Sequence, residues 1–249
     1  MDRRQRLHGQ RLGDDQRRLR AFLAVLLFLC LGETFSQEKK SGYDFMSPAT
    51  RAMQDDDFAN PGMFAVLDGE ALWKSNGCAG CHAPGSMKGV AARYPAPKDG
   101  KLVNLEQRIN ACRKAGPWPY ESKELLAITA YVASQSRGMP IAVAQDSGKG
   151  KEIFFRRQGQ LNLSCSQCHD DHAGKKLAGS VIPQGHATGY PIYRLEWQSV
   201  GSLQRRLRNC LIGMRAEAYE YGAPELVELE LYLMSRAAGL KIETPAVRP

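Results

Sequence analysis

The chain has 249 residues, 43% of them hydrophobic, which is the size and composition of one large globular domain or two of ordinary size. Its net charge of +8 falls to +5 after residue 36, because the rest keeps 27 of the 34 basic and 22 of the 26 acidic residues. No run of like charge is interleaved with aromatic side chains, which argues against a nucleic-acid-binding protein.

The first 36 residues are predicted to be a secretory signal peptide. Three arginines at positions 17–20 precede an apolar run at 21–32, which is shorter than the roughly twenty residues of a membrane span. Small residues follow, so we expect cleavage near Ser36 and no stable membrane span in the mature chain. Cys30 leaves with the signal. An uncleaved anchor is the alternative interpretation.

Each half of the remaining chain carries four features in the same order: a short helix, a CxxCH motif, an octapeptide ending in cysteine, and a longer helix. In the first half these are residues 69–77, 78–82, 105–112 and 122–138. In the second half they are residues 150–159, 165–169, 203–210 and 224–239. The octapeptides LEQRINAC and LQRRLRNC share Leu, Arg, an aliphatic residue and Cys at the same spacing. We therefore predict a duplicated domain, with domains at 37–145 and 146–249.

The longer helices have recognisable start and stop signals. Ser122 is the candidate N-cap of the first, and Pro224 lies in the first turn of the second. Gly138 and Gly239 mark the predicted ends. Apolar residues recur at three- and four-residue spacing in both helices, whereas strand patterns are scarce, so the predicted fold class is all-α.

The CxxCH motifs predict covalent haem attachment. In an exported chain, two thiols on one turn form thioether bonds to the haem edge and the adjacent histidine reaches the iron. The attachment residues would be Cys78, Cys81, Cys165 and Cys168, and the iron-ligating histidines His82 and His169. Zinc is the competing interpretation, but it explains neither the histidine after each pair nor the repeat. We predict two tandem cytochrome c-like domains, each with one haem c.

The second axial ligand of each iron has several candidates. Met139 and Met234 follow their histidines by 57 and 65 residues, but they do not occupy equivalent places in the repeat. Cys112 and Cys210 do, so each thiolate is a candidate ligand to the iron of its own half. The alternatives are a disulfide between Cys112 and Cys210, the usual fate of a cysteine pair in an exported protein, or two inert buried thiols.

Arg206 lies four residues before Cys210, on the same face of a predicted helix. A guanidinium there favours thiolate over thiol and offers a planar fork to an oxyanion. The alternative is that Arg206, like Arg108 in the first half, pairs with a haem propionate. His172 and His186, in the loop after the second CxxCH motif, are weaker candidates for hydrogen bonding or for a further metal.

The block GHATGYPIYRLEWQSVGSLQRRLRNCLIGMRAE at residues 185–217, with both CxxCH motifs and both later cysteines, resembles the SoxA family. SoxA proteins are the diheme subunits of the SoxAX cytochromes of sulfur-oxidising bacteria. The resemblance implies a periplasmic L-cysteine S-thiosulfotransferase that joins thiosulfate oxidatively to a cysteine of the carrier protein SoxYZ, with two electrons passing to haem. It also implies that the chain forms a heterodimer with a monohaem SoxX-type cytochrome c. A soluble cytochrome c would be the electron acceptor.

By the same resemblance, Cys210 is both an iron ligand and the catalytic sulfur, carried as a persulfide, and Arg206 binds the substrate. Two other functions stay open on the residues alone. One is a diheme electron carrier without covalent sulfur chemistry. The other is a diheme peroxidase, in which one iron must be five-coordinate.

Overall fold

Eight α-helices organise the part of the chain that the structure, a computed structural model, describes: residues 38–83, 85–144, 146 and 148–249. They are α2 (Pro48–Asp55), α3 (Gly62–Ser75), α4 (Leu105–Cys112), α5 (Lys123–Ser134), α6 (Lys149–Phe155), α7 (Cys165–His169), α8 (Leu203–Gly213) and α9 (Pro224–Arg236). Short 3-10 helices lie at η1 (Gly42–Phe45), η2 (Cys78–Gly80) and η3 (Ala91–Arg93). The predicted signal peptide, 1–36, lies outside the described residues.

The helices confirm the predicted duplication. In the first half Gly69 of α3 packs against the backbone of α5, and a Cβ there would lie 2.1 Å from the carbonyl oxygen of Ala127. In the second half Gly150 of α6 packs in the same way on α9, with a Cβ 2.1 Å from the carbonyl oxygen of Glu228. Only glycine permits backbones to approach this closely, so each half is built on one tightly crossed helix pair.

Aromatic side chains complete both helix crossings. In the first half the ring centroids of Trp73 and Tyr131 lie 5.7 Å apart. In the second half those of Phe154 and Tyr232 lie 5.3 Å apart. These are separations at which tilted aromatic pairs attract each other. The two halves therefore repeat not only a sequence pattern but the packing of individual side chains.

The predicted helix starts are confirmed, while the helix ends come earlier than expected. Ser122 accepts a hydrogen bond from the backbone N–H of Leu125 at 3.3 Å, and Pro224 is the first residue of α9. Helix α5 ends at Ser134 and helix α9 at Arg236. Turns continue from these ends to the predicted stop glycines, which have φ angles of 79° (Gly138) and 87° (Gly239).

The fold is helical but not purely so, which corrects the all-α prediction. The strands are β1 (Ala96–Lys98), β2 (Lys101–Val103), β3 (Lys176–Leu177), β4 (Ser180–Val181), β5 (Ile192–Arg194), β6 (Ser199–Gly201) and β7 (Ala246–Arg248). Strands β1 and β2 form one hairpin, β3 and β4 another, and β5 pairs with β6 and with β7. The hairpin turns contain left-handed residues such as Asp99 and Gln198. Such short strands, set by turn geometry, leave no alternating pattern long enough to detect in a sequence.

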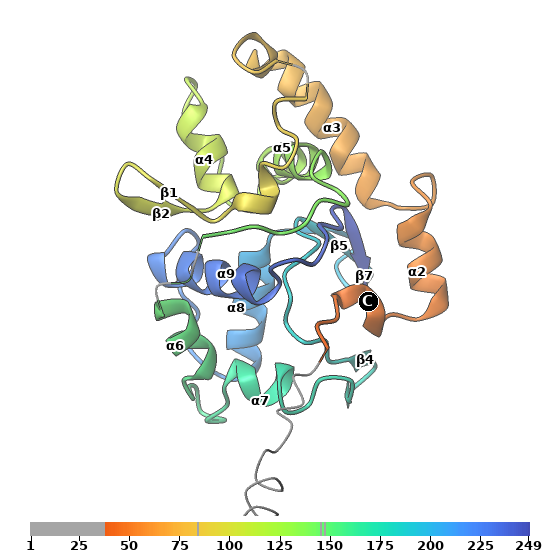
Figure 1. Cartoon of the computed structure of the whole chain (residues 1–249), viewed down its shortest axis with the longest axis vertical. Coiled ribbons are helices and arrows are strands. Elements are labelled where there is room, and N and C mark those ends of the chain that lie inside the picture. The colour runs from red at the N-terminus through yellow and green to blue at the C-terminus, as the bar shows by residue number, and fades with distance from the viewer. Residues whose placement is uncertain (1–37, 84, 145, 147) are drawn as a thin grey trace, which may run out of the picture. The chain divides into compact units, whose positions relative to one another are not determined.

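Residues 39–249 form a single compact unit, and the start of this unit packs on the second half of the chain. Helix α2 lies beside β7 (Figure 1). The side-chain amide of Asn60 donates to the carbonyl of Pro245 at 2.9 Å, and the N–H of Val247 donates to Gln54 at 3.0 Å. The N-terminal segment therefore crosses the predicted boundary at residue 145 and ties the two halves together. In the described part of the chain, no helix is both long and apolar enough to cross a membrane.

Candidate haem and sulfur site

Helix α7 presents the second CxxCH motif. Ser164 caps the helix, with its hydroxyl accepting from the N–H of Gln167, so the short helix is fixed at its start. The His169 ring places Nδ1 2.7 Å from the carbonyl oxygen of Pro183. A carbonyl only accepts, so His169 Nδ1 carries the proton and donates. Nδ1 is therefore bound to the backbone, which leaves Nε2 as the ring nitrogen of His169 that can reach Cys210 or a metal ion.

Helix α8 brings Cys210 to that histidine. The hydroxyl of Ser202 caps α8 by accepting from the N–H of Arg205 at 3.0 Å. Cys210 is half-buried on a later turn of α8 and lies within hydrogen-bonding reach of the His169 side chain. The structure thus brings together two side chains that are 41 residues apart in the sequence. Together with the CxxC thiols, these two side chains would form a donor set for one haem iron.

The electrostatics around Cys210 favour the thiolate. Desolvation acts to raise the pKa of the Cys210 thiol, but the hydrogen bond with His169 and the positive charges of Arg206 and Arg194 outweigh it, so the pKa is lowered. Burial raises the pKa of Cys165 to about 12, with a further contribution from Cys210. A lowered pKa therefore distinguishes the Cys210 sulfur from that of Cys165, and a lowered pKa is typical of a reactive cysteine.

Arg206 interacts with this sulfur, as its position four residues earlier predicts. Burial acts to lower the pKa of Arg206, but interaction with the Cys210 sulfur and with Tyr190 outweighs it and raises the pKa. Helix α8 thus supplies both the sulfur and a guanidinium. The guanidinium of Arg206 can therefore hold an anion next to the Cys210 sulfur.

Arg194 is a member of the site that the sequence patterns did not reveal. It lies on β5, is 8% exposed, and pairs with Glu196 at 2.8 Å. Its Nε has no hydrogen-bond partner among the described residues. Its charge is one of those that lower the pKa of Cys210. No spacing rule joins Arg194 to Cys210, because only the packing of β5 near α8 places them together.

The first half repeats the arrangement in a more open form. Its CxxCH motif lies on η2, and the His82 ring packs against Trp73 with centroids 5.4 Å apart. Cys112 is exposed at the end of α4. Burial raises the pKa of Cys78, with a further contribution from Cys112, so these two thiols belong to one site. All six described cysteines are free in the structure, with no bond joining Cys112 to Cys210.

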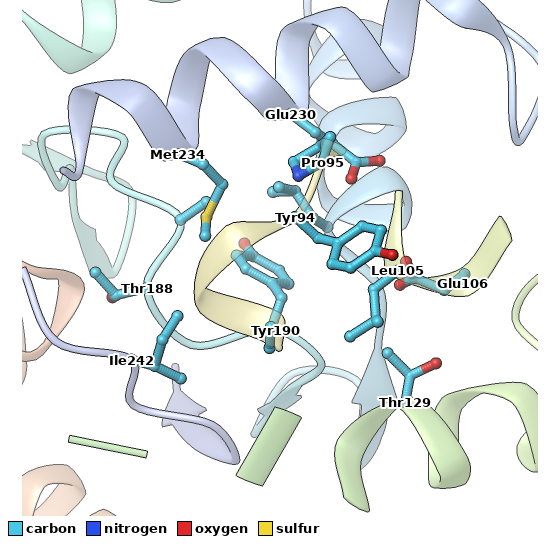
Figure 2. A pocket seen from close by; sticks show the side chains of 13 residues that line it. Tyr94, Pro95, Leu105, Glu106, Thr129, Thr188, Tyr190, Glu230, Met234 and Ile242 are labelled. Carbon is cyan, nitrogen blue, oxygen red and sulfur yellow. The ribbon is translucent and has the colours of Figure 1, made fainter. Parts of the chain in front are cut away.

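The two candidate methionine ligands, Met139 and Met234, lie in different surroundings. Met139 lies against Gly89, where a Cβ would be 3.1 Å from the methionine methyl group. Met234 is buried and lines a cavity between the two halves (Figure 2). The two methionines thus occupy different kinds of place, as their unequal positions in the repeat predict.

The loop histidines make ordinary backbone contacts. His172 Nδ1 lies 2.6 Å from the carbonyl of Gln167, and His186 Nδ1 lies 2.6 Å from that of Lys40. No group of three His, Cys, Asp or Glu side chains that could hold a further metal ion is found within the described ranges.

The residues present fit a c-type haem in each half. Each site offers two free thiols on one turn, a histidine directly after them, and a further cysteine nearby. In the second site Nδ1 of His169 is bound to the backbone, and the ring lies within hydrogen-bonding reach of the Cys210 sulfur. This donor set is the one that thioether attachment and axial ligation require.

Comparison with known proteins identifies the family. The family model described as SoxA/TsdA, cytochrome c domain, matches residues 68–141 and 149–242. The chain belongs to the SoxA family. Two matched segments establish that it contains tandem cytochrome c domains, and such domains carry haem c.

SoxA relatives match this chain over most of its length. The L-cysteine S-thiosulfotransferase subunit SoxA of Pseudaminobacter salicylatoxidans is 39% identical, over 85% of this chain and 81% of the relative. The SoxA subunit of Rhodovulum sulfidophilum is 38% identical, over 85% and 80%. The solved structure of SoxXA from P. pantotrophus superposes with a TM-score of 0.81 at 35% identity, covering 85% of this chain and 87% of that chain.

Proposed function

We propose that this SoxA family member is the SoxA subunit of a periplasmic L-cysteine S-thiosulfotransferase and acts in thiosulfate oxidation. It joins thiosulfate to a cysteine of the carrier protein SoxYZ. The observation that carries the proposal is the environment of Cys210, which lies within hydrogen-bonding reach of His169 and interacts with the charge of Arg206. The relatives that are 39% and 38% identical to this chain are both named L-cysteine S-thiosulfotransferase subunit SoxA, which supports the proposal.

Each half holds one haem c in this proposal. Cys78 and Cys81 attach the first haem, and His82 and Cys112 ligate its iron. Cys165 and Cys168 would attach the second haem, and His169 and Cys210 would ligate its iron. The haems supply oxidising equivalents by accepting electrons one at a time. The domains are 37–145 and 146–249, with the two matched family segments inside them.

The protein's own residues carry the sulfur chemistry. Arg206 binds the thiosulfate dianion by charge-assisted hydrogen bonds beside Cys210, whose sulfur is carried as a persulfide. The carrier thiol and thiosulfate meet beside this sulfur, where S–S bonds form and break readily because sulfur is both a good nucleophile and a good leaving group. In the net reaction one S–S bond forms between thiosulfate and the carrier cysteine, the carrier thiol loses its proton, and two electrons leave.

The partners follow from the same chemistry. A monohaem SoxX-type cytochrome c forms the heterodimer, consistent with the SoxXA complex whose SoxA fold this chain shares. SoxYZ delivers the acceptor cysteine, and a soluble cytochrome c removes the electrons. The signal peptide at 1–36 directs the chain to the periplasm, where haem attachment takes place.

Mass spectrometry of the purified protein tests the proposal directly. We expect the intact mass to equal that of the processed chain plus two haems, and the Cys210 peptide to carry one extra sulfur atom. Electron paramagnetic resonance should show low-spin, thiolate-ligated iron from both haems. A near-infrared methionine band would instead identify an electron carrier, and high-spin iron a peroxidase. Either result would contradict the proposal.

Replacement of Arg206 by alanine should weaken thiosulfate binding. Charge-assisted hydrogen bonds contribute about 1.5–3 kcal/mol, so we expect the KM for thiosulfate to rise about 10- to 100-fold. Arg108→Ala is the matched control, since Arg108 holds the equivalent place in the first octapeptide. If the Arg206 variant keeps its KM but shifts the potential of the second haem, Arg206 pairs with a propionate instead. Steady-state kinetics and a redox titration distinguish these results.

A further inference from the structure

A cavity of about 60 Å³ lies between the two halves of the molecule, and no residue of a CxxCH motif lines it. Residues from both halves line it, including Thr129 of α5 and Thr188 of the segment before β5 (Figure 2). This volume accommodates more than one water molecule. Most of its neighbours are apolar or aromatic, so polar groups that face it have few partners.

Two carboxyl groups face this cavity, one from each half. Glu106 of α4 is 9% exposed and Glu230 of α9 is 6% exposed. The side-chain amide of Asn104 donates to Glu230 Oε1 at 3.1 Å. Burial raises the pKa of both carboxyl groups, and the charge of Glu106 raises that of Glu230 further. Two neighbouring carboxyl groups in a buried interface cannot both be ionised without a large penalty.

Several polar atoms around the acid pair have no partner. The hydroxyls of Thr129 and Thr188 are buried without a hydrogen bond among the described residues, and both residues are 2% exposed or less. Gln204 of α8 is 1% exposed, and its Nε2 is likewise unpaired although the amide faces Glu230. Buried polar groups are rarely left unpaired in folded proteins, so ordered water in the cavity is the expected partner.

The other ionisable groups near the pair do not neutralise it. Glu121 interacts with Glu106 and adds negative charge, while Arg205 lies 3.9 Å from Glu121. Tyr120 is close to both carboxyl groups, and its pKa is raised, first by burial and then by their charge. Tyr94 and Tyr190 complete the ionisable lining of the cavity. A proton is therefore the simplest neutralising group.

The pair lies close to both proposed iron centres. Glu106 precedes Cys112 by six residues on α4, and Gln204 precedes Cys210 by six residues on α8. Six residues of helix correspond to a rise of about 9 Å. Glu106 and Gln204 also hold the same place in the duplicated octapeptides. A charge at this site therefore lies near enough to act electrostatically on both centres.

We propose that Glu106 and Glu230 form a proton-binding site: together with cavity water they hold one proton between the two halves, and the site takes up a proton when a neighbouring iron centre gains an electron. The first part of this proposal, the shared proton, rests only on the packing of the described residues. The second part, proton uptake on reduction, rests on the proposed haem binding. The site neutralises the charge that an electron adds, since an unpaired charge is costly in this interface.

Unfolding at two pH values tests the first part. Both carboxyl groups have a pKa above the unfolded value of about 4.3, so the native state binds more protons and stability falls as the pH rises from there through the raised pKa values. We expect Glu230→Gln to raise the unfolding midpoint at about pH 9 relative to the native protein, and not at about pH 5. Glu124→Gln, on the exposed start of α5, should change neither midpoint. An equal change at both pH values would overturn the proposal.

Glu106→Gln is the second variant, because glutamine already occupies the equivalent place, Gln204, in the other half. Infrared spectroscopy of the folded protein should show the C=O stretch of a protonated carboxylic acid at about pH 6, and each variant should lose it. Persistence of this band in both variants would show that the proton lies elsewhere.

Proton uptake tests the second part. Electrochemical reduction at an electrode, followed by a pH-indicator dye near pH 7, should consume protons in the native protein and less than about half as many in Glu230→Gln. Equal uptake in the two would contradict the link to reduction. Thiosulfate is not used, so this result does not depend on the sulfur chemistry. Failure of the proposed transferase activity and failure of the proton site are therefore separate outcomes.

Discussion

The Cys210→Ala variant is expected to lose thiosulfate-dependent electron transfer by at least about 10³-fold, because removal of a nucleophile leaves only binding and electrostatic contributions. Cys210 is the cysteine that lies against His169 and two arginines, and its lowered pKa favours the reactive thiolate. The assay is reduction of cytochrome c in the presence of SoxYZ and thiosulfate. The spectrum of the second haem should also change, since its proposed sulfur ligand is removed.

Cys112→Ala is the matched control for this experiment. Cys112 occupies the same place in the first octapeptide but is exposed. We expect its loss to alter the spectrum of the first haem while most of the turnover is retained. Full activity in Cys210→Ala, or equal losses in both variants, would show that the catalytic sulfur is not the one assigned here.

The Gly150→Ala variant should be destabilised by about 3 kcal/mol or more, at the upper end of what overpacking costs. The added methyl carbon would lie 2.1 Å from the carbonyl oxygen of Glu228 and 2.7 Å from the Cβ of Tyr232. The first of these is a backbone atom, so α6 and α9 must separate to relieve the contact. Chemical denaturation of the haem-loaded protein measures the free energy of unfolding.

Two comparisons make this result specific. Gly69→Ala introduces the same contact between α3 and α5 and should have a similar effect. Gly213→Ala, at the end of α8, meets no atom within 4 Å and should change the free energy of unfolding by less than about 1 kcal/mol. A loss below about 1 kcal/mol in Gly150→Ala would mean that the helices do not cross as closely as described.

Local spacing in the sequence was sufficient to predict most of the candidate site residues. The two CxxCH motifs, the octapeptides ending at Cys112 and Cys210, and the position of Arg206 one turn before Cys210 are all short-range patterns. The duplication, the helix starts at Ser122 and Pro224, and the family could be predicted from them. The predicted helix ends, Gly138 and Gly239, lie beyond the observed ends of α5 and α9, because the last turns before these glycines are not α-helical.

Other features depend on contacts between distant segments, which no spacing rule encodes. The short strands arise from local turns and pairing, and the N-terminal segment packs on β7 through side chains such as Asn60. Arg194 joins the sulfur site only because β5 packs near α8. Glu106 looks like a surface helix residue in the sequence, yet the meeting of α4 with α9 buries it.

The sequence by itself determined the chemistry of this protein, because haem attachment and sulfur reactivity need particular residues at fixed short spacings along the chain. The tertiary structure alone decided the environment of that chemistry: that Arg194 joins Arg206 near Cys210, and which carboxyl groups become buried between the halves. Burial and electrostatic coupling act through space, and they therefore depend on packing between segments that the linear order of residues does not reveal.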